Sequence, residues 1–211
     1  MAEELGKIEK PEVESFRLGR KLLYVPLLYG GEGFPEEYLK KTAAYWEQAL
    51  KQITDITARL GAVKHIFHEL VAETGEAGKE AVKQVNPDGK AVIEAALGQG
   101  ADIAALEDAA NLTEYMDWGR CLYIGLQNPD VQQKVIESYR AAGEARKKHM
   151  AEVIDTTLRQ DEMGLLIMQE NHGVTIPSDI QVFYVAPPAL DDIKRWLRDQ
   201  EAAAQKDGGN A

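Results

Sequence analysis

The chain has 211 residues, of which 45% are hydrophobic and 28% are charged, and its formal net charge is −11. These proportions are typical of a soluble globular protein with a sizeable core. The negative charge disfavours nucleic acid and anionic membranes as partners, because both are bound through basic patches. A single cysteine, Cys121, rules out an internal disulfide and fits a reducing compartment.

No apolar run approaches the roughly 18 residues that a membrane span needs, and the acidic N-terminus lacks the pattern of a secretory signal. We therefore expect a cytoplasmic protein. Its expected partner is a small-molecule ligand or another protein, and the sequence leaves a homo-oligomer open.

The first predicted element is a mostly apolar strand near residues 21–29, which a glycine-rich turn closes. Pro26 lies within it, and because proline donates no backbone hydrogen bond, it predicts an edge position or a bulge. A long helix is predicted over residues 35–60, where apolar side chains recur at helical spacing. Pro35 suits its first turn and Gly61 suits its end.

A second strand near residues 62–70 completes a β-α-β unit, so the two strands should run parallel. Residues 74–160 then read almost entirely as helix. Breaks in this helical region are expected at residues 86–89, 98–102 and 127–130.

Two further strands are predicted near residues 164–170 and 180–186, followed by an amphipathic helix. The expected fold is therefore α/β, with a small, largely parallel sheet of about four strands covered by helices. We expect a single domain over residues 1–199, with a helical insertion near 74–128, and a flexible tail over 200–211.

Arg146 lies in the middle of an apolar stripe on the helix predicted from Pro129 to about Gln160. Burying a guanidinium without a partner is costly, so a carboxylate or an anionic ligand should meet it. The alternative is that the side chain extends to the surface along its own apolar stem.

Polar groups follow two of the predicted strands. Glu69 ends the second strand, and Glu170, Asn171 and His172 follow the third. Because these strands should be parallel, both groups lie at the edge where open α/β sheets bind ligands. An imidazole there can act as a metal ligand, a general base or a capping partner, and Glu69 can equally form an ion pair with a nearby lysine or arginine.

Metal-binding patterns are weak. His65 and His68 cluster with Glu69 only if their segment is helical, and its β-branched and aromatic residues favour a strand. Glu114 and Asp117 share one helical face, which is compatible with a metal-binding pair, but a solvated acidic face is the favoured interpretation.

Four fragments, in this order, resemble the Tiki/TraB superfamily, whose relatives include the erythromycin-esterase-like and ChaN-like proteins: KLLYVPLLYGGEGFPEEYLKK, VKHIFHEL, ALEDAANLTEYM and ARKKHMAEVIDTTLRQDEMGLLIMQENHGV. The resemblance places Glu69 on the glutamate that ends the second strand and Glu107 on the acidic residue of a helical segment. Arg146 takes the position of the arginine in the helix, and His172 that of the histidine in a Gly-x-x-His motif.

The resemblance implies that Glu69, Arg146 and His172 converge in one pocket, where Glu107 and Asn171 bind substrate. Members of this superfamily are regarded as hydrolases, some of them metal-dependent, or as ligand and haem binders. A divalent metal or haem is therefore an implied cofactor.

The chain departs from the family pattern in two places. No histidine follows the first strand, and Gln169 stands where the second motif has glycine. The remaining groups are too few for a typical catalytic metal unless Glu32, His65 or His68 substitutes.

Two hypotheses follow. In the first, the chain is a small-molecule hydrolase in which Glu69 is the general base, His172 assists and Arg146 holds an anionic group of the substrate. In the second, it is a non-catalytic protein that binds a ligand or a protein partner. The convergence of three polar residues favours the first hypothesis, and the missing first histidine favours the second.

Overall fold

One parallel sheet organises the computed structural model, which describes residues 18–208. Its strands, in the order β3-β2-β4-β1-β5, are β1 (Arg20–Pro26), β2 (Val63–His68), β3 (Asp102–Ala104), β4 (Met163–Met168) and β5 (Ile180–Tyr184). The α/β class is confirmed. The sheet has five strands where about four were expected, and every neighbouring pair is parallel.

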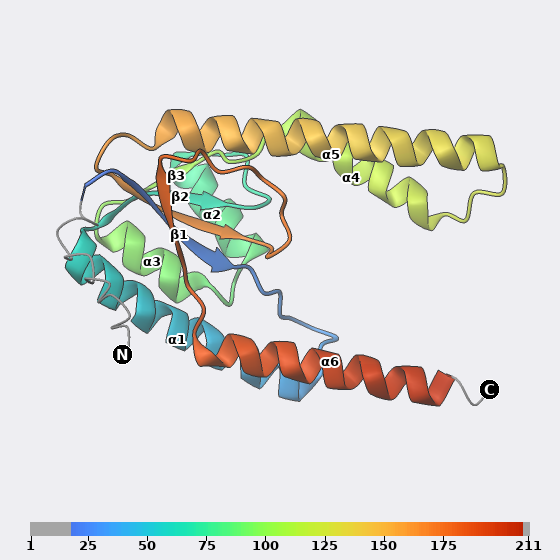
Figure 1. Ribbon diagram of the computed structural model, residues 1–211, viewed down its shortest axis with the longest axis horizontal. Coiled ribbons are helices and arrows are strands. Elements are labelled where there is room, and N and C mark those ends of the chain that lie inside the picture. Colours follow the sequence, from blue (N-terminus) through green and yellow to red (C-terminus); the bar gives the residue numbers. More distant parts are fainter. Residues whose placement is uncertain (1–17, 209–211) are drawn as a thin grey trace, which may run out of the picture.

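Helices cover both faces of the sheet (Figure 1). One face, here called the α1 face, packs against α1 (Glu36–Leu60), α2 (Gly75–Val85), α3 (Lys90–Gly98) and α6 (Pro188–Gly208). The other, called the α5 face, packs against the C-terminal half of α5 (Pro129–Thr157). The remaining helix, α4 (Ala109–Tyr123), packs along α5.

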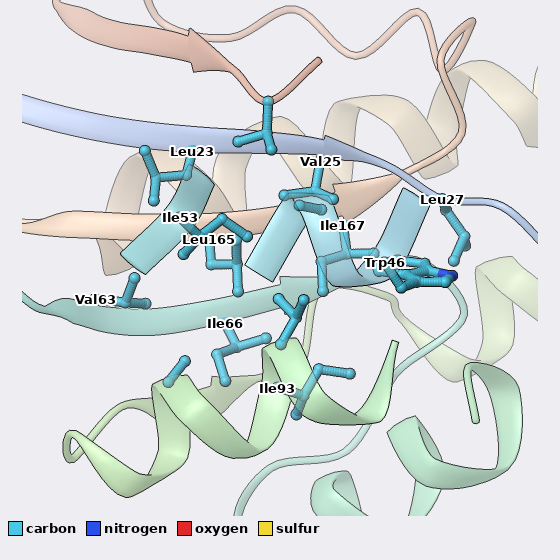
Figure 2. Packing of buried hydrophobic residues seen from close by; sticks show 14 of the residues in the cluster. Leu23, Val25, Leu27, Trp46, Ile53, Val63, Ile66, Ile93, Leu165 and Ile167 are labelled. Carbon is cyan, nitrogen blue, oxygen red and sulfur yellow. The ribbon is translucent and has the colours of Figure 1, made fainter. Parts of the chain in front are cut away.

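The central strands are apolar on both sides because both of their faces are covered. All six residues of β4 are buried. Figure 2 shows the α1 face, where strand residues pack against helix residues: Leu23, Val25, Val63, Ile66, Leu165 and Ile167 against Trp46, Ile53 and Ile93. Alternate residues, such as Leu22 and Phe67, lie in the cluster under α5.

Pro26 does not mark an edge strand, because β1 lies between β4 and β5. The backbone N–H of Leu27 donates to Met168 of β4 at 2.8 Å. Since N–H groups alternate along a strand, the nitrogen of Pro26 faces the β5 side, where pairing has already ended at Tyr184. No hydrogen-bond donor is needed there, so an internal strand tolerates the proline.

The segment expected to be a helical insertion has a different role over much of its length. Helices α2 and α3 cover the sheet, and β3 joins it as an edge strand beside β2. Only α4 and the N-terminal half of α5 extend beyond the sheet, as a helical hairpin (Figure 1). The insertion therefore supplies part of the core.

The ends of the chain differ from expectation in one respect. Helix α6 continues to Gly208, so most of the segment from residue 200 is helical instead of forming a tail. Its run of alanines favours helix. The acidic N-terminal segment, expected to lack a secretory signal, lies outside the described residues, as do residues 209–211.

Between residues 18 and 208, no helix combines the length and the apolar character that crossing a membrane requires.

Candidate functional site

A cavity of about 430 Å³ opens at the carboxyl edge of the sheet, beside the ends of β2 and β4. After β2 the chain continues into α2 on the α1 face, whereas after β4 the following loop places Val174 on the α5 face. Neighbouring strands whose connections leave toward opposite faces create a crevice between them. The lining residues are Tyr29, Glu69, Leu70, Leu112, Tyr115, Met116, Gly143, Arg146, Lys147, Met150, Met168, Gln169, Asn171, His172 and Gly173.

Arg146 of α5 is held by two carboxylates. Its Nε donates to Glu107 Oε2 at 2.9 Å, and its Nη2 donates to Glu107 Oε1 and, at 3.2 Å, to Glu69 Oε1. The guanidinium also lies over the ring of Tyr115, 5.1 Å from its centroid. Burial disfavours the charged form, but the two carboxylates outweigh it and raise the pKa of Arg146. The structure thus provides the carboxylate partner that the apolar stripe predicted.

Glu107 lies behind Arg146 and away from the cavity. Its side chain is 0% exposed, and it is absent from the lining residues. Its Oε1 also accepts the backbone N–H of Leu70 at 3.0 Å, which holds this residue at a φ of 69°. Glu107 was expected to bind substrate. In this arrangement it positions Arg146 and the turn after β2.

Glu69 links the ends of two strands. Its Oε1 accepts from Arg146, and its Oε2 accepts the backbone N–H of Gln169, directly after β4, at 2.8 Å. Each carboxylate oxygen therefore already accepts a hydrogen bond from a fixed donor. These contacts fix the carboxylate between the ends of β2 and β4.

His172 faces the cavity with a hydrogen-bond donor. Its Nδ1 accepts the backbone N–H of Val174 at 2.9 Å, so in the neutral ring the proton is on Nε2. Burial lowers the pKa of His172, although the charge of Glu69 opposes this, and the ring is neutral at pH 7. The edge of the ring also contacts Tyr24, with centroids 5.2 Å apart.

The two other polar residues predicted after β4, Glu170 and Asn171, point in different directions. Asn171 is exposed and lines the cavity. Glu170 points elsewhere, because its Oε1 accepts from Tyr184 and Lys194.

The structure does not bring His65 and His68 together. His65 contacts Glu162 at 3.2 Å on the α5 side, whereas His68 is fully buried on the opposite side beside Asn86. Neither lines the cavity. In the part of the chain that the structure describes, no three or more His, Cys, Asp or Glu side chains are placed to hold a metal ion.

The acidic pair on α4 also has other contacts. Glu114 accepts from the indole of Trp118, and Asp117 forms an ion pair with Arg120. Both contacts are at the surface, in agreement with the solvated interpretation.

Sequence reasoning missed the aromatic contribution of α4. Tyr115 stacks on Tyr139 of α5 with centroids 4.7 Å apart, and each ring lies on a glycine of the opposite helix, Gly143 or Gly119. A Cβ on either glycine would come within 3.4 Å of the ring. The two glycines let the helices approach closely enough for Tyr115 to reach Arg146. In each helix the glycine follows its tyrosine by four residues, and this repeated spacing was the signal in the sequence.

Comparisons of the chain with protein-family models, with curated proteins and with solved structures give no significant match. The Tiki/TraB resemblance therefore stays a prediction based on four short fragments.

Proposed function

We propose that this chain is a cytoplasmic small-molecule-binding protein whose ligand occupies the cavity at the ends of β2 and β4 and is not hydrolysed there. One observation carries the proposal: the proton acceptors expected to act on a substrate already accept hydrogen bonds from fixed donors of the fold. Glu69 accepts from Arg146 and Gln169, and His172 accepts from Val174 through Nδ1. The volume of about 430 Å³ lies within the range of ligand pockets.

Hydrolysis would need a different arrangement. A general base must have a free lone pair directed at water, with a pKa near the working pH. Glu69 is held by a cation and a backbone N–H, and His172 presents Nε2–H. The proposal is compatible with the Tiki/TraB resemblance, because ligand binders are among those relatives.

A thermal-shift screen tests the proposal. The full chain is heated with members of a library of small polar metabolites, with Mn²⁺, Zn²⁺, Co²⁺ or haem as separate additions. A ligand that binds only the native state raises Tm. We expect at least one metabolite to do so, and we expect His172→Phe to reduce the shift. Glu170→Gln is the matched control, since Glu170 adjoins the site but points away from it.

Mass spectrometry of the stabilising compound after incubation separates the two hypotheses. Recovery of the compound unchanged supports binding without catalysis. Its hydrolysis by the wild type and not by Glu69→Gln would overturn the proposal in favour of a hydrolase. A library in which no compound raises Tm would overturn it in favour of a protein partner.

A further inference from the structure

Three residues at the cavity have hydrogen-bond donors available for a ligand: Arg146, His172 and Asn171. Arg146 uses Nε and Nη2 for its carboxylates, and its Nη1 has no hydrogen-bond partner among residues 18–208. His172 offers Nε2–H, because Nδ1 is occupied. Asn171 offers its side-chain amide at the rim. A ligand that satisfies Arg146 and His172 must bring an acceptor.

The charges around the cavity disfavour an anion as that acceptor. Arg146 contributes one positive charge against the two negative charges of Glu69 and Glu107, which leaves −1. Lys147 is paired with Glu144 and adds nothing to the balance. The chain as a whole carries −11, so the long-range field also repels anions.

A cation is disfavoured for a different reason. The free groups on Arg146 and His172 are hydrogen-bond donors, which direct positive ends of N–H dipoles at the ligand. Glu69 is the one carboxylate among the lining residues, and both of its oxygens already accept hydrogen bonds. A cationic donor would face these N–H groups, and it would share each oxygen of Glu69 with a donor of the fold.

Part of the remaining wall is apolar, although Met150 and Met168 are almost fully buried within it. It includes leucine and methionine side chains from four parts of the fold: Leu70, Leu112, Met116, Met150 and Met168. Methionine adjusts to irregular shapes and makes favourable contacts with aromatic rings. This wall favours a ligand with an apolar or aromatic group beside its polar end.

We infer that the cavity takes an uncharged molecule that offers a carbonyl oxygen to Arg146 and His172 and places an apolar or aromatic group against the accessible side chains of Leu112 and Met116. The inference rests on the proposed function and names the class of its ligand. A neutral carbonyl meets the donors without adding charge to a site that already has a negative balance.

Three small probes of the same shape and the same number of non-hydrogen atoms test this: benzamide, benzoate and benzamidine, which are neutral, negative and positive. Each is titrated into the millimolar range against the isotopically labelled full chain, because fragments of this size bind weakly. The amide signals of Leu70, Gly143 and Gly173 report binding at the cavity. We expect benzamide to bind about fivefold or more tightly than either charged probe.

Two variants locate the interaction. His172→Phe keeps a ring but removes Nε2–H, and it should weaken benzamide binding about two- to tenfold. Because this change also removes the acceptor for Val174, the exposed Asn171→Ala is used as a second variant. Glu170→Gln should leave the affinity unchanged.

The outcomes separate the two claims. Tighter binding of benzoate or benzamidine at the same amide signals would overturn the ligand class and leave the binding function standing. The absence of shifts at the cavity signals with all three probes would overturn both. Unchanged benzamide affinity in His172→Phe would overturn the assigned contact to His172, whatever the effect of Asn171→Ala.

Discussion

At the scale of single residues, the ion cluster of Arg146, Glu69 and Glu107 combines two residues of the cavity wall, Arg146 and Glu69, with a carboxylate that is fully buried behind them. Glu107→Ala leaves the guanidinium with one carboxylate and the N–H of Leu70 without its acceptor. Breaking a buried ion pair from one side costs about 3–5 kcal/mol. We expect a loss of this size in the free energy of unfolding, measured by urea denaturation.

The control for this prediction is Glu114→Ala, a surface carboxylate on α4 that should change stability by less than about 0.5 kcal/mol. Equal effects of Glu107→Ala and Glu114→Ala would show that the cluster is solvated in solution. The premise that Arg146 is fixed would then be lost.

His68 makes the stability of the chain depend on pH. Its Nδ1 donates to the carbonyl of Glu69, and its Nε2 accepts from Asn86, so the buried ring is neutral. Burial lowers the pKa of His68 to about 4, whereas the unfolded value is about 6.5. The unfolded state therefore binds the proton first as the pH falls.

The contribution of His68 is fully present above about pH 6.5 and is lost as the pH falls toward 4, by roughly 3 kcal/mol in total. Urea unfolding at several pH values measures it. In His68→Gln, the free energy of unfolding should fall less steeply as the pH is lowered, because the ring that takes up the proton is gone. The variant is nevertheless less stable overall. Parallel slopes for wild type and variant between pH 6.5 and 4 would contradict a buried neutral His68.

Part of the site could be predicted residue by residue. The parallel order of the strands placed Glu69 and His172 at one edge, and the apolar stripe favoured a carboxylate or an anionic ligand near Arg146. The tautomer of His172 could not be predicted, because it depends on the turn at Gly173, whose φ of 65° brings the N–H of Val174 to Nδ1. Such a contact has no signature in composition or spacing.

At the scale of elements, Gly164 of β4 leaves room on the α5 face for side chains of the neighbouring strands β1 and β2. A Cβ at this position would lie 2.8 Å from the ring of Phe67 and 3.0 Å from Leu22, both fully buried. We expect Gly164→Ala to lower the free energy of unfolding by about 1–3 kcal/mol through overpacking. Gly98→Ala is the control, because a Cβ there meets nothing and the residue ends a helix. It should leave stability unchanged or raise it by up to about 1 kcal/mol.

The elements also show where sequence patterns fail. The bounds of helix α1 were predicted closely, because apolar residues recur at helical spacing over its 25 residues, with Pro35 before them and Gly61 after them. Strand β3 was missed, since three residues are too few to show alternation. The prediction that Pro26 marks an edge strand was wrong. Proline lacks a backbone N–H, and this matters only where a neighbouring strand would accept that hydrogen bond, which is not the case at Pro26.

At the scale of the whole molecule, the two ends of the α4–α5 pair are stabilised very differently. The C-terminal half of α5 buries Met150 and Ile154 against the sheet. Helix α4 has no buried residue, and the hairpin tip leaves Tyr123 and Ile124 mostly exposed. Tyr115 and Met116, which line the cavity, therefore belong to a helix that is held by few buried contacts.

This difference predicts that α4 opens without global unfolding. Hydrogen exchange followed by mass spectrometry should show peptides from residues 109–123 exchanging well before those from β1 and β4, because local opening is easiest where few apolar contacts are buried. Tyr139→Phe removes the hydrogen bond to Tyr115 and should speed exchange in α4 about two- to tenfold while leaving β1 unchanged. If α4 exchanged only with the central strands, the hairpin would be part of the same cooperative unit.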